Sequence, residues 1–222
     1  MLYLSHPLLS SALSWAEGEC HFLTIEHRRT FREVIASLLA EAAGDRGSFL
    51  LSQDHLPMEF SKYVEVITDP FSLDATLQKK LVTAIEKETI DLANHEYAGE
   101  FLSLFTTLQG ILETLKFRHS HDVTYDQNFE AGALLKLFHF RPDSEDLSLV
   151  EKWIQYMELS AQYQGKKLFV WIGIAPLLSK EEWDAFLRTI QYRKWNLLFL
   201  DPISPPCAVD HHTIIDEDFC EL

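Results

Sequence analysis

The stretches Lys167-Leu168-Phe169-Val170-Trp171-Ile172 and Asn196-Leu197-Leu198-Phe199-Leu200 decide the fold class of this 222-residue chain. Each is a nearly continuous apolar run, which is typical of a strand covered on both faces of a sheet. Between them, Ser179 and Glu182 have the spacing of a capping box that opens a helix. The apolar face of that helix follows at Trp183, Phe186, Leu187 and Ile190. The segment therefore predicts a β-α-β unit with two parallel strands.

The first part of the chain adds strands and a helix to this unit. Residues 20–25 and 63–67 are short apolar runs that we interpret as strands. A helical pattern extends from about Thr30 to Ala43 and is closed by Gly44. Both ends of the chain thus predict alternating strands and helices.

The middle of the chain has helical periodicity instead. One apolar stripe comprises Leu77, Leu81, Ile85 and Leu92, and a second comprises Phe101, Leu104, Phe105, Leu108, Ile111, Leu112 and Leu115. The near-heptad spacing of the second stripe favours one helix packing along another. Beyond a polar break at 118–126, we expect helices at about 129–138 and 144–163.

These patterns predict an α/β protein made of two parts. Residues 1–74 and 166–222 form a discontinuous α/β head domain, and residues 75–165 form an α-helical leg domain inserted into it. A nucleotide-binding head would need a phosphate-cradling loop, but residues 26–31, which follow the first parallel strand, contain no glycine. ATP hydrolysis by the usual P-loop route is therefore disfavoured.

Composition limits the partners of the chain. It has 19 Lys and Arg against 34 Asp and Glu, a net charge of −15, and 47% apolar residues. A field of this sign opposes the approach of nucleic acid, so any DNA binding needs a local basic surface or a cation. Cys20, Cys207 and Cys220 form no CxxC pair, which indicates a reducing compartment. With no apolar run long enough for a membrane span, we expect a cytoplasmic protein.

Two small basic groups are candidates for phosphate contact. Arg28, Arg29 and Arg32 lie on the opening turns of the first helix, where positive charge opposes the helix dipole. Lys116 and Arg118 end the long helix of the middle segment. Phosphate contact would explain the three arginines, and ion pairs with nearby acids would explain them equally well.

Acidic residues form two candidate metal sites. Glu26, Asp69 and Asp201 each follow or end a predicted strand, where they could hold a divalent cation and a phosphate. Asp69-Pro70 and Asp201-Pro202 are equally typical of turns. The second group flanks the break between two helices and offers hard oxygen ligands of the kind calcium prefers: Glu113, Asp122, Asp126 and Glu130. The alternative for this group is a solvated acidic face.

Histidines are a further possibility for a metal. His119 and His121 lie beside Asp122, and His211 is adjacent to His212. Either group could ligate a transition metal, although neither has a recognised ligand spacing and loop histidines are common.

The order of these motifs resembles the small CRISPR-associated adaptation protein of type II-A systems. The resemblance rests on 23–26, 66–69, Tyr125-Asp126, the β-α-β segment through Asp201-Pro202, and Ile214-Ile215-Asp216-Glu217-Asp218-Phe219. It implies a non-catalytic protein with a degenerate P-loop-ATPase-like head and a helical leg. It further implies a homotetrameric ring that binds calcium and threads double-stranded DNA by its ends.

The resemblance also implies partners and site residues. The partners would be the CRISPR adaptation integrase and the RNA-guided nuclease, in spacer acquisition. Asp126, in the hinge pattern, becomes the first calcium ligand, with Asp122, Glu130 and Glu113 as its neighbours; Gln127 stands where another acid is expected. The alternative function is a metal-dependent phosphohydrolase or nuclease that uses Glu26, Asp69 and Asp201.

Overall fold

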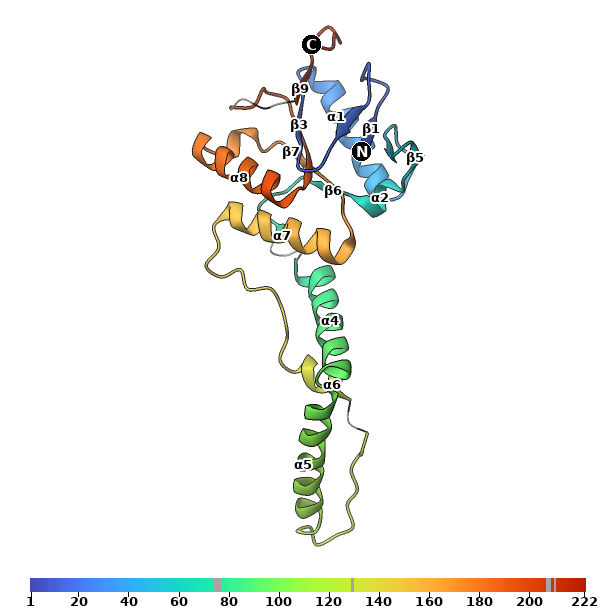
Figure 1. The fold of residues 1–222 in the computed structure, drawn as a ribbon, viewed down its shortest axis with the longest axis vertical. Helices are drawn as coiled ribbons and strands as arrows, with labels where there is room; N and C mark the ends of the chain where they lie inside the picture. The colour runs from blue at the N-terminus through green and yellow to red at the C-terminus, as the bar shows by residue number, and fades with distance from the viewer. Residues whose placement is uncertain (74–76, 129, 207–208, 210) are drawn as a thin grey trace. The chain divides into compact units, whose positions relative to one another are not determined.

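The computed structural model describes residues 1–73, 77–128, 130–206, 209 and 211–222, with the backbone alone at 77 and 78 (Figure 1). Cys207, the expected domain boundary at 74 and 75, and the expected helix start at 129 lie outside the described residues. The chain divides into two compact units. Unit 1 comprises Met1–Leu73 and Asp146–Leu222, and unit 2 comprises Asp74–Glu145.

A five-stranded parallel sheet forms the centre of unit 1. Its strands, in spatial order, are β6 (Val64–Ile67), β7 (Leu168–Ile172), β8 (Asn196–Asp201), β3 (Cys20–Ile25) and β9 (His211–Ile215). Every residue of β7 is buried, as its apolar run predicts. The predicted β-α-β unit is confirmed, because β7 and β8 are parallel neighbours connected through α8 (Lys180–Arg193).

Helices and a second sheet cover the two faces of this sheet. Figure 1 shows β3 and β7 between α8 and α1 (Arg28–Ala42). On the α8 side, aromatic rings from α7 (Leu149–Gln164), α8 and the sheet contact one another: Trp153, Trp171, Trp183, Phe186 and Phe199. The other face belongs to the core that includes Leu168, Val170 and Ile172 together with Val34 and Leu38 of α1.

The second sheet of unit 1 is antiparallel and has the order β2 (Leu13–Trp15), β1 (Leu2–Ser5), β4 (Leu50–Gln53) and β5 (Leu56–Pro57). The sequence patterns did not predict it, because its strands are short and are interrupted by polar turns. Unit 1 also contains two short elements, α2 (Phe60–Tyr63) and the 3-10 turn η2 (Ala175–Leu177).

Unit 2 is helical. It contains the π-helical turn η1 (Leu77–Leu81), α4 (Val82–His95), α5 (Ala98–Lys116) and α6 (Ala131–Lys136). Helix α5 has no buried residue, so the helix expected to pack along its apolar stripe is absent from the described part of the chain. No helix in the described ranges combines the length and apolarity needed to cross a bilayer.

Helix α7 lies in unit 1, although its sequence pattern placed these residues in the leg. Its Trp153 is fully buried, contacts the Trp171 ring at 4.8 Å between centroids, and donates a hydrogen bond from Nε1 to the Pro70 carbonyl at 2.9 Å. The helical unit therefore ends at Glu145 rather than at residue 165.

Candidate functional site

Helix α1 presents three arginines on its first turns. His27 caps the helix, because its side chain accepts a hydrogen bond from the backbone N–H of Thr30, and the first turn contains no acidic residue. Arg29 Nε forms an ion pair with Glu33 Oε1 at 2.9 Å. Arg28 and Arg32 are exposed, and neither has an ion pair or hydrogen bond with the described residues. Two of the three cations are therefore available to a ligand.

The second basic group lies in unit 2. Lys116 is in the last turn of α5, where positive charge suits the helix dipole, and its Nζ lies 3.9 Å from Glu113 Oε2. Arg118 is exposed just beyond the helix. Lys116 therefore has a structural partner, whereas Arg118 has no side-chain partner within the described ranges.

One hydrogen bond joins two of the predicted hinge segments. Tyr125 donates from its hydroxyl to Glu113 Oε1 at 2.7 Å, and this bond to a carboxylate raises the pKa of Tyr125. The adjacent Asp126 accepts at Oδ1 from the Asn128 N–H at 2.9 Å, which is a local turn contact. The bond to Glu113 therefore holds Tyr125, which precedes Asp126, beside α5.

The four hinge carboxylates have suitable chemistry for calcium, which binds six to eight oxygen ligands. No three of them, however, approach closely enough to form one ligand group in the described part of the chain. The described part of one chain thus supplies too few converging carboxylates for a complete calcium cage, and the remaining oxygens would have to come from the backbone, water or another copy.

The three acids at strand ends are not gathered into a metal site among the described residues. Glu26 and Asp69 are exposed, and Asp69 Oδ1 accepts from the Phe71 N–H at 3.0 Å, as expected of a turn. Asp201 is buried and accepts at Oδ2 from the Ala175 N–H at 3.0 Å. Burial raises the pKa of Asp201 to about 6, and the Ala175 and Ile174 N–H groups partly oppose that rise. Asp201 therefore orders the loop after β7.

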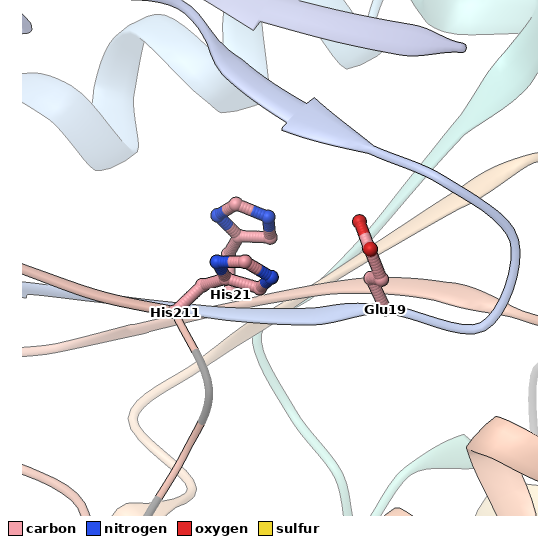
Figure 2. A group of neighbouring side chains, drawn as sticks. All are labelled: Glu19, His21 and His211. Carbon is pink, nitrogen blue, oxygen red and sulfur yellow. The ribbon is translucent and has the colours of Figure 1, made fainter.

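A group of donors that the sequence patterns did not bring together lies at the amino ends of β3 and β9. Glu19, His21 and His211 each place a ligand atom within 4.8 Å of the others (Figure 2). The spacing of Glu19 and His21 places both on one side of β3, and this was visible in the sequence. The pairing of His211 with His21 was not, because it depends on two strands distant along the chain.

His211 and His212, which the sequence suggested as one metal site, have different surroundings. The His211 ring stacks on the His21 ring with centroids 4.4 Å apart, whereas His212 Nε2 lies 2.9 Å from Thr24 Oγ1. Successive residues of a strand point to opposite faces, so the pair cannot ligate one ion together.

The described geometry defines a class, namely a mixed α/β protein with a parallel sheet. The first turns of its helix α1 are basic, and its inserted helical unit exposes the apolar side chains of α5. A family model described as CRISPR-associated protein (Cas_Csn2) matches residues 42–219. The chain belongs to this family, and the resemblance to the type II-A adaptation protein is confirmed. No curated protein matches the chain.

Proposed function

We propose that this protein is a non-catalytic DNA-end-binding protein of CRISPR spacer acquisition. It acts in the cytoplasm as a calcium-stabilised homotetrameric ring around linear double-stranded DNA, together with the adaptation integrase and the RNA-guided nuclease. Membership of the Cas_Csn2 family supports the CRISPR role. The observation that carries the assembly is the exposed apolar stripe of α5.

The apolar stripe of α5 has the spacing of a helix–helix seam. Its members recur at alternating intervals of three and four residues: Phe101, Leu104, Leu108, Ile111 and Leu115. Leu104, Ile111 and Leu115 are each 50 to 53% exposed, so the stripe is left uncovered by the described chain. Burying a large apolar side chain is worth about 1.5–3 kcal/mol, which makes a second copy of this helix a suitable cover.

An assembly also resolves the conflict between DNA binding and a net charge of −15. Phosphate contacts require local Lys and Arg, and Arg28 and Arg32 of α1 are exposed without partners among the described residues. Several copies that direct these arginines towards one enclosed surface would concentrate positive potential there. A single subunit has too few such contacts to overcome its own field.

Calcium fits this assembly as an ion that is bound by carboxylates of more than one copy of the chain. Glu113, Asp122, Asp126 and Glu130 supply hard oxygens but do not form a complete cage within one chain. When bound, the ion would neutralise carboxylates and so reduce repulsion between acidic subunits. The absence of glycine after β3 and the backbone hydrogen bond of Asp201 support a degenerate, non-catalytic head.

The proposal is tested by comparing linear and covalently closed circular duplexes of the same sequence in a gel-shift assay. Each is measured with calcium and with a calcium chelator, and light scattering gives the mass of the protein under the same conditions. We expect a tetramer that retards linear DNA only, and only with calcium. Equal binding to linear and circular DNA would overturn the ring. Binding of the same affinity with calcium and with the chelator would overturn the role of calcium.

A further inference from the structure

Glu19, His21 and His211 form a compact group of donors in unit 1, outside the basic and acidic groups described above. Their ligand atoms lie within 4.8 Å of one another. Figure 2 shows the two imidazole rings stacked one above the other, with the Glu19 carboxylate beside them. The group combines two nitrogen ligands with one oxygen ligand.

The fold holds these residues together through strand pairing. Glu19 immediately precedes β3 and His21 is its second residue, so the period of two places both on one face. His211 is the first residue of β9 and is the register partner of His21 in the parallel pair. The positions of all three are thus set by the backbone of the sheet.

His21 has a buried nitrogen without a partner among the described residues. The residue is only 7% exposed, and no atom of the described chain hydrogen-bonds to its Nε2. A hydrogen bond to the Ser14 backbone engages the ring, and since Nε2 has no partner this bond must use Nδ1. Leaving a buried polar atom unsatisfied costs about 1–3 kcal/mol, so the orphaned Nε2 requires an explanation.

The same arrangement prepares His21 to act as a metal ligand. The bond to the Ser14 backbone engages Nδ1 and leaves the lone pair of Nε2 free. Trp15 contacts the ring at 4.6 Å and is itself fixed by a hydrogen bond from Nε1 to the Leu197 carbonyl.

Solvent reaches the group from one side. Glu19 and His211 line a pocket of about 570 Å³ whose wall also includes Glu17 and Asp184. A metal ion can therefore enter from the pocket and keep a water molecule as a further ligand. The wall also includes Arg188, and Glu17 is paired with Lys194, so the charges around the pocket are mixed.

We propose that Glu19, His21 and His211 bind one divalent transition metal ion, of which zinc is the best match. Two imidazoles and one carboxylate, with an open position, are a donor set that zinc adopts, whereas calcium prefers oxygen ligands alone. The stacked rings lie 9° from parallel, so binding requires His211 to turn its ring until its lone pair converges with that of His21. His211 is exposed. The ion would tie the edge strand β9 to β3.

The test uses the full chain without a histidine tag and Co²⁺ as a spectroscopic probe. We expect one Co²⁺ per chain, with the strong visible absorption of a low-coordinate ion, displaced by Zn²⁺ and not by excess Ca²⁺. Glu19→Gln and His211→Ala should each weaken Co²⁺ binding by at least about tenfold, since even partners of ligands contribute that much. Glu33→Gln and His55→Ala, at exposed positions of the same unit and outside the pocket, are the matched controls and should bind like the parent.

Melting curves supply a second measurement. Zn²⁺ should raise the melting temperature of the parent, because an ion that binds only the folded state stabilises it, and should not raise that of His211→Ala. Unchanged affinity in both ligand variants, an equal loss in the controls, or failure of the parent to bind Co²⁺ would each overturn the proposal.

Discussion

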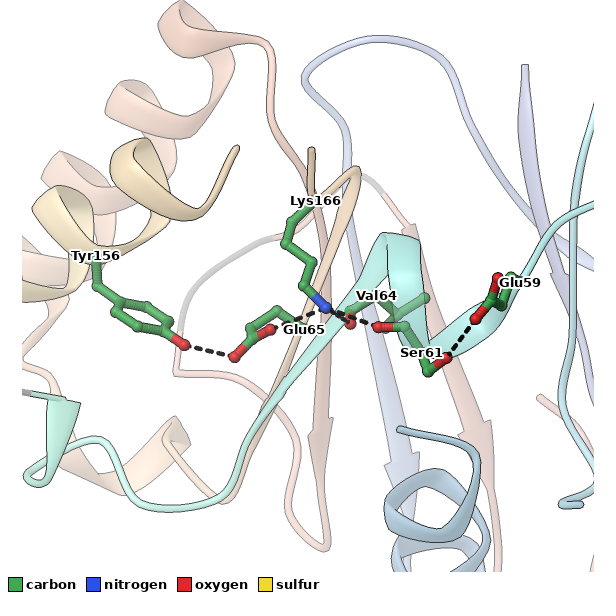
Figure 3. A network of polar contacts seen from close by, with 6 residues as sticks. All are labelled: Glu59, Ser61, Val64, Glu65, Tyr156 and Lys166. Carbon is green, nitrogen blue, oxygen red and sulfur yellow. Dashed lines mark hydrogen bonds and ion pairs between the residues drawn. The ribbon is translucent and has the colours of Figure 1, made fainter. Parts of the chain in front are cut away.

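Lys166 and Glu65 form an ion pair with Nζ and Oε2 3.1 Å apart, and their side chains are only 10% and 18% exposed. Figure 3 shows that Lys166 Nζ also donates to the carbonyls of Ser61 and Val64, at 2.9 and 2.8 Å. Tyr156 of α7 donates its hydroxyl to the other Glu65 oxygen. This network joins α2, β6, α7 and Lys166, which lies two residues before β7.

Glu65→Gln should destabilise unit 1 by about 3 kcal/mol, because removing one partner leaves the charge of the other nearly buried and uncompensated. Urea unfolding followed by tryptophan fluorescence measures this loss. The matched control is Glu158→Gln, which breaks the pair of Glu158 with Arg193, whose side chains are 41% and 42% exposed. That change should cost less than about 1 kcal/mol. Equal losses would mean that the Lys166 network contributes no more than a surface contact.

The apolar stripe of α5 should govern assembly. Ile111→Glu places a charge in the middle of the stripe and should reduce the mass measured by light scattering, because an interface between helices cannot bury an unpaired carboxylate. Leu102→Glu is the matched control, since Leu102 is 68% exposed and lies outside the stripe. Its mass should equal that of the parent. A parent that is monomeric, or an Ile111→Glu variant of unchanged mass, would contradict assembly through α5.

The arginines of α1 should differ in their effects on DNA binding. Arg28→Ala and Arg32→Ala remove exposed cations without partners in the described chain, whereas Arg29 is already paired with Glu33. Each of the first two should weaken binding of linear duplex more than Arg29→Ala does. Affinity for DNA falls as salt rises, and the slope of log affinity against log salt concentration counts the neutralised phosphates. Each of these two variants should reduce the size of this slope by about 1 for every phosphate that it no longer neutralises.

Affinities measured across a series of salt concentrations give that slope. Arg46→Ala, at an exposed arginine of the same unit, removes the same charge and should leave the slope unchanged. An identical loss in all four variants would indicate a general effect of charge rather than contact by α1.

The sequence predicted the parts of the fold that depend on local signals. The Ser179 capping box is confirmed, with Ser179 Oγ accepting from the Glu182 N–H at 3.3 Å. The start of the preceding helix at 144 was wrong, because a second capping box places Ser148 as the cap and Glu151 at its third position. Polar residues precede the apolar face of α7 at Ser144 and again at Ser148. Only the reciprocal hydrogen bonds between Ser148 and Glu151 show which serine caps the helix.

Features that depend on long-range pairing could not be predicted in the same way. The assignment of α7 to unit 1 follows from contacts of Trp153 with Trp171 and Pro70, which are distant in sequence. The group of Glu19, His21 and His211 likewise requires β9 to lie beside β3 in one particular register. A shift of one residue would replace His211 by His212, whose neighbour is Thr24. The residue types were visible, but their juxtaposition was not.

Asp201 should make stability depend on pH in a direction opposite to that of most carboxylates. Burial raises its pKa from 3.8 to about 6, so the folded state binds this proton more tightly than the unfolded state. The stabilising contribution is therefore complete below pH 3.8 and is lost as the pH rises through 6. One pKa unit corresponds to about 1.4 kcal/mol, so with some solvent screening the change is about 2 kcal/mol.

Asp201→Asn keeps an oxygen to accept the Ala175 N–H but cannot ionise. The free energy of unfolding of the variant minus that of the parent should increase by about 2 kcal/mol between about pH 4 and pH 7, which urea titrations at each pH would measure. A constant difference across this range would show that Asp201 ionises normally. Because the carboxylate is bound by backbone N–H groups, the same variant should retain DNA binding. If the parent hydrolysed ATP or DNA with magnesium or manganese and Asp201→Asn abolished that turnover, the hydrolase alternative would replace the non-catalytic role.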